Sequence, residues 1–486
     1  MKVAVLHPSA VGSTSPFKDL DPDCDPARFL PRASSENISI HKATAVRQVV
    51  EISQRGFDVA INLCDGAWDE DRPGIEVVQA LEKLDVAYTG AGPEFYDPSR
   101  TAMKMGCHSA GLSIPAYVLA RGDEDIERAA ASLRFPLIVK HPGSYSSIGM
   151  SRDSRVSDWR SLRREAARII AAYGAALVEE FIEGREFTVL VAEPRDGAAA
   201  PWILQPAEYT FPAGESFQHF DLKWRDYARM EIRPVEDAPL AARLRDAAAK
   251  TFLALNGSGY GRCDMRMDAA GDIHVLEINP NCGVFYPEGQ YGAADFILAR
   301  DAGGHRGFVE HLIACAIRRR DRNRRPWEIR YDRASGFGLY AARPIKAGEV
   351  VQTWEERPHP LVSRRHVDRA WDALRRRWFD QYAWPLTDEV HVMWSADPDE
   401  WRPVNHSCDP NTWLDGLDVM ARRDIARDEA ITMDYATFSG PGMEPFDCRC
   451  GTALCRRVIR GDDCRLPELR ERYRDHVSDY VKRAFG

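Results

Sequence analysis

Three cysteines lie close together near the C-terminal end of the chain, at Cys448, Cys450 and Cys455. Thiolates are soft ligands that hold zinc in tetrahedral sites of four, so this spacing predicts a zinc site that needs one more ligand. Two residues can supply it: Cys408, which stands directly before an Asp-Pro turn, and Cys464, which is closer in sequence. The short segment that carries the three cysteines cannot build a core of its own, so we expect the metal to fold it.

A second set of residues offers hard oxygen ligands. Asp264 lies on one predicted strand, and Glu277 and Asn279 lie on the next, after the turn at 270–272. Because side chains alternate along a strand, Glu277 and Asn279 share one face, and Asp264 can join them from the adjacent strand. Such oxygens, with room left for phosphates, are what Mg²⁺ requires, so the sequence predicts a magnesium site.

A lysine ends the strand predicted at 135–140, and a loop rich in glycine and serine follows it at 142–150. A fixed charge at Lys140 beside exposed backbone N–H groups suits phosphate oxygens. A further strand, predicted at 176–181, carries Glu179 and Glu180.

The elements that must position these residues fall into an α/β part and a mostly-β part. The first segments alternate between strand and helix, which favours a parallel sheet. We predict strands at 2–7, 57–64 and 86–89, helices at 44–55, 74–84 and 305–320, and a long Pro/Asp/Ser-rich loop at 12–36. In the second part we predict short strands from Trp327 onward, a helical insert at 361–380 and a C-terminal helix at 467–485.

Composition limits the classes of function. A chain of 486 residues predicts two to four domains, and its net charge of -9 argues against a nucleic-acid-binding protein. No apolar run reaches the ~18 residues that a membrane span needs. The eleven cysteines are scattered except at the C-terminal end, which is typical of a reduced, cytoplasmic protein with one metal site. The basic run at 318–325 is interpreted as a solvated helix end and linker, or alternatively as a docking patch for an acidic substrate.

The first part of the chain, to about residue 317, resembles the ATP-grasp fold and most closely its D-alanine–D-alanine ligase branch. The resemblance rests on five strings: Ala87-Tyr88-Thr89-Gly90, Ile138-Val139-Lys140, Ser146-Ser147-Ile148-Gly149-Met150, Gly184-Arg185-Glu186-Phe187-Thr188-Val189, and the stretch from Glu277 to Gly283. The family's glycine-rich turn with its substrate-binding glutamate has no counterpart between His7 and Ser15. The family's His-Gly element is here Cys64-Asp65-Gly66, so the resemblance implies ATP but not D-alanine as the substrate.

The resemblance implies a role for each matching residue of this half. Lys104 and Lys140 would contact ATP phosphates, and Lys223 would reach the γ-phosphate. Glu179, Glu180 and Ile182 would form the adenine hinge, and Glu186 would hold the ribose. Arg262 would stabilise the charge that develops in the transition state. Asp264, Glu277 and Asn279 would hold the magnesium.

Residues 326–460 resemble the SET-domain lysine methyltransferases with a post-SET zinc tail. The matching motifs are Gly336-Phe337-Gly338 with Leu339-Tyr340-Ala341, Ile345 to Glu349, Asn405 to Asn411, Glu429 to Tyr435, and Cys448-Arg449-Cys450-Gly451 with Cys455. By this resemblance Gly336, Phe337, Gly338, Asn405 and His406 would bind S-adenosylmethionine, and Tyr435 would lie beside the methyl-transfer channel. It also favours Cys408 over Cys464 as the fourth zinc ligand. Met433 stands where the family has phenylalanine or tyrosine, which leaves the number of methyl groups transferred open.

These expectations combine into an α/β ATP-grasp domain followed by a mostly-β SET domain with a zinc-binding tail. We predict the boundaries 1–317, a basic linker at 318–326, a SET domain at 327–447, and a zinc segment with a C-terminal helix at 448–486. The favoured hypothesis is an enzyme with two activities: ATP-dependent ligation of a carboxylate to an amine, and methylation of a lysine-bearing protein, a peptide or a small amine. The alternative is a methyltransferase whose ATP-grasp half only binds substrate.

Overall fold

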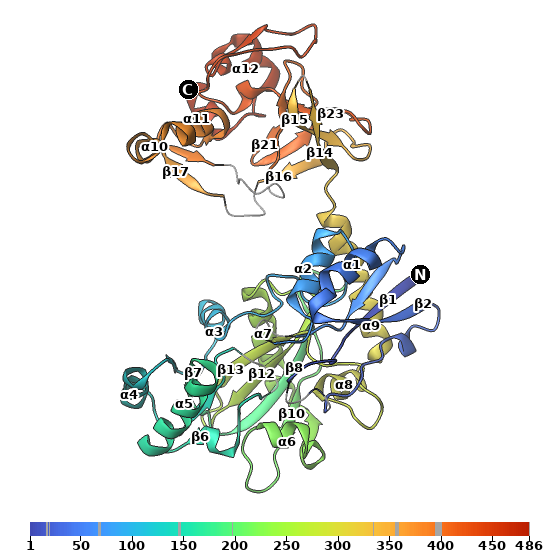
Figure 1. The fold of residues 1–486 in the computed structure, drawn as a ribbon, viewed down its shortest axis with the longest axis vertical. Coiled ribbons are helices and arrows are strands. Elements are labelled where there is room, and N and C mark those ends of the chain that lie inside the picture. Colours follow the sequence, from blue (N-terminus) through green and yellow to red (C-terminus); the bar gives the residue numbers. More distant parts are fainter. Residues whose placement is uncertain are drawn as a thin grey trace. The chain divides into compact units, whose positions relative to one another are not determined.

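The computed structural model describes residues 1–15, 18, 20–66, 70–143, 147–196, 198–333, 335–354, 359–393 and 401–485. They form two units, Met1–Arg322 and Asn323–Gly486, and each is described by itself (Figure 1). The first unit is an α/β structure and the second is mostly β, as predicted. Among the helices in the described ranges, none is both long and apolar enough to cross a membrane.

The N-terminal sheet is parallel and has the strand order β2-β1-β3. Its strands are β1 (Lys2–Pro8), β2 (Ser34–Ile40) and β3 (Val59–Asn62), and its helices are α1 (Ala45–Ser53) and α2 (Ile75–Lys83). Alternating apolar residues explain the packing, since Ala4 and Leu6 of β1 face Val49 of α1 and Val78 of α2 in one core. The parallel sheet and both helices were therefore predicted correctly.

Three predictions in this region differ from the structure. The loop expected over 12–36 ends earlier, because β2 begins at Ser34 and pairs with β1 along its whole length. The strand expected at 86–89 is reduced to one parallel bridge between Ala60 and Tyr88. Strand β3 is also shorter than the expected 57–64. Pairing to a neighbouring strand decides these limits, and apolar runs alone do not reveal it.

A second sheet is antiparallel, with the order β4-β7-β5-β6. The strands are β4 (Tyr117–Ala120), β7 (Ala176–Glu180), β5 (Leu137–Lys140) and β6 (Arg155–Val156). Helices α4 (Asp123–Ser132) and α5 (Trp159–Tyr173) cover one face, where Leu162 and Ile169 pack against Val139 and Val178. Side-chain alternation leaves Lys140 and Glu179 on the opposite face.

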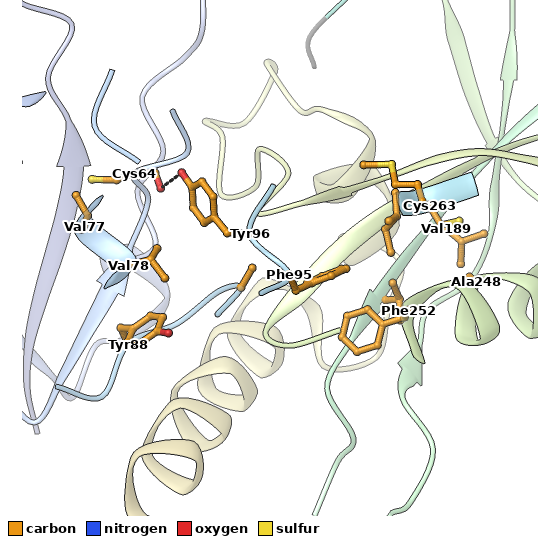
Figure 2. Packing of buried hydrophobic residues seen from close by; sticks show 14 of the residues in the cluster. Cys64, Val77, Val78, Tyr88, Phe95, Tyr96, Val189, Ala248, Phe252 and Cys263 are labelled. Carbon is orange, nitrogen blue, oxygen red and sulfur yellow. Dashed lines mark hydrogen bonds between the residues drawn. The ribbon is translucent and has the colours of Figure 1, made fainter. Parts of the chain in front are cut away.

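The largest sheet has the order β11-β10-β8-β12-β13, with β9 paired to β8. Its strands are β8 (Arg185–Ala192), β9 (Trp202–Ile203), β10 (Ala207–Thr210), β11 (Glu231–Pro234), β12 (Tyr260–Met267) and β13 (Ile273–Pro280). The helices of this region are α3 (Arg100–Ser109), α6 (Phe220–Trp224), α7 (Ala238–Ala254), α8 (Ala293–Leu298) and α9 (Gly304–Asn323). Figure 2 shows Ala248 and Phe252 of α7 packed with Val189 and Cys263. The alternate residue Leu190 instead joins the core beneath α8 and α9.

Part of the basic run predicted as a linker lies inside α9 and is engaged in the first unit. Arg319 is buried and donates hydrogen bonds to the carbonyl oxygens of Tyr88 at 2.7 Å and Gly90 at 3.1 Å. Arg318 forms an ion pair with Asp196. These two side chains therefore hold the end of α9 against the unit.

The second unit consists of small sheets. One has the order β14-β15-β23-β20, from β14 (Trp327–Asp332), β15 (Gly336–Ala341), β23 (Ala430–Met433) and β20 (Asn405–His406). The others contain β16 (Val350–Thr353), β22 (Asp418–Ala421) and β21 (Thr412–Asp415); β17 (Leu361–Ser363), β19 (Val390–Val392) and β18 (Trp384–Pro385); and β24 (Phe446–Asp447) with β25 (Val458–Ile459). The predicted insert contains α10 (Arg364–Ala370) and α11 (Ala373–Tyr382).

The single C-terminal helix that we predicted is two helices, α12 (Pro467–Tyr473) and α13 (Asp479–Phe485). Arg474 ends the first with a φ of 47°, in the left-handed region. The His476 ring then stacks on Trp413 with centroids 3.8 Å apart. The turn between the two helices is thus held against β21, which helical periodicity did not predict.

Candidate active sites and metal centre

The three predicted magnesium ligands lie together on neighbouring strands. Asp264 of β12 pairs directly with Glu277 of β13. The Asn279 side-chain nitrogen donates to the carboxylates of Asp264 at 3.0 Å and Glu277 at 3.1 Å. Thr188 of β8 adds a 2.7 Å hydrogen bond to Asp264. The hard donor set fits Mg²⁺ with phosphates in the remaining positions.

Two arginines neutralise these carboxylates. Arg262, predicted to stabilise the transition state, donates to Asp264 through two nitrogens at 3.0 and 2.9 Å. Arg100, the first residue of α3, forms an ion pair with Glu277. Sequence reasoning missed Arg100, because no local pattern connects it with a strand far along the chain. Burial would raise the pKa of Glu277, but Arg100 and Lys140 hold it at about 2.

The two predicted phosphate lysines share one buried carboxylate. Glu179 lies between Lys104, with which it forms an ion pair, and Lys140, whose Nζ is 2.7 Å from Oε2. Burial would raise the pKa of Glu179, yet the two lysines lower it to about 2. The three side chains thus form one charged cluster between the middle of α3 and the ends of β5 and β7.

The residues predicted to bind adenosine line one pocket together with Lys140. The pocket wall includes Glu179, Glu180, Ile182 and Glu186, with Lys140, Lys223, Arg262, Asp264 and Glu277. Arg134 donates a hydrogen bond of 2.8 Å to the Glu180 carboxylate. The backbone of Glu180, rather than its side chain, is therefore the part that could bind adenine in the predicted hinge. Burial raises the pKa of Glu186 to about 7, although Arg266 lies 3.1 Å away.

Lys223 stands on α6 and faces the metal end of this pocket. Burial, followed by the charge of Arg262, lowers the pKa of Lys223 to about 8. Of the predicted loop after Lys140, Ser144, Tyr145 and Ser146 lie outside the described residues. Of the loop residues that the structure describes, Ser147, Ile148 and Met150 line the pocket.

In the second unit, the predicted S-adenosylmethionine residues are interlocked. Asn405 donates from its side chain to the carbonyl oxygen of Phe337 at 3.2 Å. A Cβ at position 338 would lie 2.5 Å from that same side-chain nitrogen, so any larger residue there would displace the Asn405 amide. Gly336 has a φ of 75°. Phe337, Asn405, His406 and Tyr435 all line one large cleft.

Tyr435 and His406 are fixed by hydrogen bonds. The Tyr435 hydroxyl donates to the carbonyl oxygen of Val404 at 2.9 Å, and the Tyr435 N–H donates to Nδ1 of His406 at 3.2 Å. Burial raises the pKa of Tyr435 to about 12 and lowers that of His406 to about 4. At neutral pH both are uncharged, and Nε2 of His406 carries the proton because Nδ1 accepts.

Four thiols meet at the C-terminal tail, as predicted. The Sγ atoms of Cys408, Cys448, Cys450 and Cys455 all lie within 4.8 Å of one another. Zn–S bonds of 2.3 Å in a tetrahedron place sulfurs about 3.8 Å apart. The Cys408–Cys448 distance is 3.9 Å, so the set fits zinc. Cys464 instead packs among Ala436, Leu469 and other apolar residues.

A buried ion pair next to these thiols was also missed from the sequence. Arg456 directly follows Cys455 and donates to the two oxygens of Asp434 at 2.6 and 2.7 Å. Asp434 is fully buried and also accepts from the Tyr473 hydroxyl at 3.0 Å. Because Asp434 precedes Tyr435, the pair joins the tail to the cleft that Tyr435 lines.

Comparisons with known proteins agree with this division. A family model described as the D-ala D-ala ligase C-terminus matches residues 107–286, and the SET domain model matches residues 336–436. D-alanine–D-alanine ligase B of Chromobacterium violaceum is 30% identical over 237 residues, which cover 48% of this chain and 73% of that protein. The D-alanine–D-alanine ligase of Hydrogenovibrio crunogenus is 31% identical over 242 residues, or 49% and 71%.

Solved structures show the same fold for the first unit. The crystal structure of D-alanine–D-alanine ligase from Bacillus anthracis aligns with a TM-score of 0.52 at 18% identity, and it covers 67% of this chain and 100% of that one. The same enzyme complexed with ATP aligns with a TM-score of 0.51 at 19% identity, covering 67% and 99%. The ATP-grasp fold is therefore confirmed, followed by a mostly-β SET domain.

Proposed function

The chain belongs to the D-alanine–D-alanine ligase family and continues into a SET domain, and from this we propose that it is an enzyme with two activities. The first unit joins a carboxylate to an amine at the expense of ATP. The second transfers a methyl group from S-adenosylmethionine to the amine of a lysine side chain or a related molecule. The acceptor is a lysine-bearing protein, a peptide or a small amine. All eleven cysteines carry free thiols, which supports a cytoplasmic location.

The cluster of Asp264, Glu277 and Asn279 carries the ligase proposal. Four cations lie around it, namely Arg100, Arg262, Lys140 and Lys223. ATP supplies a γ-phosphoryl group that passes to the substrate carboxylate; the amine then forms the amide bond and phosphate leaves. Asp264, Glu277 and Asn279 would hold Mg²⁺. Lys140 and Lys223 would neutralise phosphate oxygens, and Arg262 would stabilise the charge that develops during transfer. Because the turn at 7–15 and the Cys64-Asp65-Gly66 element differ from the family's, we assign no D-alanine substrate.

Calorimetry of the full chain tests this half. We expect a nonhydrolysable ATP analogue to bind in the presence of Mg²⁺, and a mixture of amines and carboxylic acids to stimulate ADP release. Absence of nucleotide binding would refute the ligase proposal. Binding without any stimulated ADP release would favour the alternative, in which the ATP-grasp unit only presents substrate.

The position of Tyr435 beside Asn405 and His406 carries the methyltransferase proposal. A free lysine has a pKa near 10.4, so its deprotonation at pH 7 costs roughly 4–5 kcal/mol. Tyr435, Phe438 and Trp384 form an aromatic wall, in which the Phe438 ring centroid lies 5.3 Å from that of Tyr435 and 5.1 Å from that of Trp384. This wall would desolvate the amine and so lower the cost of its deprotonation. The Tyr435 hydroxyl and the Val404 carbonyl oxygen are placed to orient it.

We further propose that Cys408, Cys448, Cys450 and Cys455 bind one structural zinc ion, which closes the tail over the cleft. Labelled S-adenosylmethionine, incubated with the full chain and with lysine-containing peptides, tests the methyl transfer by mass spectrometry. The expected result is a mass gain of one methyl group or more on a lysine. A protein that binds S-adenosylmethionine but labels no lysine or amine would refute this half.

A further inference from the structure

The predicted magnesium ligands are already paired with cations of the chain itself. Glu277 forms its ion pair with Arg100, and Asp264 accepts the two arms of Arg262. The Arg100 and Glu277 side chains are only 10% and 19% exposed, so water screens their attraction weakly. The charges of the two arginines thus cancel those of the two carboxylates.

Further cations lie at the same end of the pocket. Lys140 and Lys223 line it, and both act with Arg100 to hold the pKa of Glu277 low against the effect of burial. A divalent cation that arrives alone therefore meets a locally positive site whose oxygens are occupied. A triphosphate brings about four negative charges and reverses this balance.

The Arg100 guanidinium can bind either the Glu277 carboxylate or a phosphate group. Its backbone is fixed as the first residue of α3, where Ser99 caps the helix by accepting from the N–H of Ala102 at 3.1 Å. Its long side chain lines the pocket and forms the ion pair with Glu277. A guanidinium matches phosphate oxygens as well as it matches a carboxylate.

We propose that Arg100 keeps divalent metal off Glu277 until a nucleotide binds. The triphosphate draws the guanidinium away from the carboxylate, and Glu277 then becomes free to bind the metal. Metal loading is thereby conditional on nucleotide. This inference rests on the proposed ATP-dependent function of the first unit, and it adds a role for a residue outside the family's matched motifs.

Binding of Mn²⁺ to the full chain, followed by electron paramagnetic resonance, tests the inference without relying on activity. Mn²⁺ prefers the same oxygen ligands as Mg²⁺. Wild type should bind Mn²⁺ with a nonhydrolysable ATP analogue and at least about tenfold more weakly without it. Arg100→Gln should bind Mn²⁺ without nucleotide at least about tenfold more tightly than wild type, since one adjacent charge is removed. Arg100→Lys, which retains the charge, should behave as wild type.

Arg163→Gln is the matched control, because Arg163 forms an exposed ion pair with Asp123 in the same unit. It should leave Mn²⁺ binding unchanged. The inference is overturned if Arg100→Gln gains no affinity for Mn²⁺ alone, or if wild type binds Mn²⁺ equally well with and without nucleotide. If wild type binds the nucleotide analogue but either comparison fails, only the proposed role of Arg100 is refuted. If wild type binds no nucleotide, both the ligase proposal and this inference are refuted.

Discussion

Replacing Cys408 by serine should release zinc from the C-terminal tail and stop methyl transfer, while ATP binding continues. Cys408 is fully buried and is the one thiol of the set that lies outside the tail, since it follows β20. Its Sγ also accepts from the backbone N–H of Arg456 at 3.3 Å. A metal at this site would therefore fix the tail to the body of the SET domain.

The metal should dominate the stability of the tail. Strands β24 and β25 have two residues each, and an isolated two-stranded hairpin is marginal in water. Burial of Ile459, the fully buried aliphatic residue of β25, contributes about 1.5–3 kcal/mol. Structural zinc contributes ~10–16 kcal/mol of apparent binding energy. Shared among four thiolates, this is about 2.5–4 kcal/mol each, so loss of one should weaken zinc binding roughly 10²- to 10³-fold.

Elemental analysis, hydrogen exchange and calorimetry measure the three consequences. Wild type should contain one zinc per chain, and Cys408→Ser should lose it, with fast exchange over residues 446–460 and unchanged binding of an ATP analogue. Cys464→Ser is the matched control, because Cys464 packs against Leu469 and Tyr473 rather than the other thiols. The reasoning is refuted if Cys408→Ser retains its zinc or if Cys464→Ser alone releases it.

Three further predictions concern the active sites. Glu277→Gln removes a charge from the magnesium site and should lower ligase turnover by two orders of magnitude or more, measured as ADP release; turnover at the wild-type rate would contradict this. Tyr435→Phe loses the 2.9 Å hydrogen bond to Val404 and should lower the methyl-transfer rate by orders of magnitude. Affinity for S-adenosylmethionine should be retained, because the hydroxyl acts mainly in the transition state. An unchanged single-turnover rate would exclude the Tyr435 hydroxyl from the mechanism. Lys223 is charged below its pKa of about 8 and loses its proton above it, so ATP affinity should fall about tenfold between pH 7 and pH 9, and Lys223→Gln should flatten this dependence in calorimetry.

The magnesium cluster could be predicted from the sequence because its geometry is local. Glu277 and Asn279 are two residues apart on one strand, and strand alternation alone places them on one face. The short turn at 270–272 makes β12 and β13 neighbours, so Asp264 meets Glu277 across the pair. The cysteine spacing is local in the same sense, and only the fourth thiol required the resemblance to SET proteins.

The partners of these residues could not be predicted because they come from distant segments. Arg100 meets Glu277 only after α3 has packed beside β13. Arg456 meets Asp434 only after the tail has returned to β23. Buried charges require such partners, yet neither hydrophobic periodicity nor a short motif specifies which arginine will provide them.

The Arg456–Asp434 pair connects the tail that carries the predicted zinc ligands to the cleft that Tyr435 lines. Asp434 binds Arg456, which follows the predicted zinc ligand Cys455, and Asp434 itself directly precedes Tyr435. If zinc is lost and the tail leaves, Asp434 remains as a fully buried carboxylate without its arginine, which costs several kcal/mol unless the backbone around it moves. Such a movement would carry Tyr435 with it and break the 3.2 Å hydrogen bond from its N–H to His406. Chelation should therefore affect methyl transfer through the position of Tyr435, while every residue assigned to the nucleotide pocket lies in the other unit.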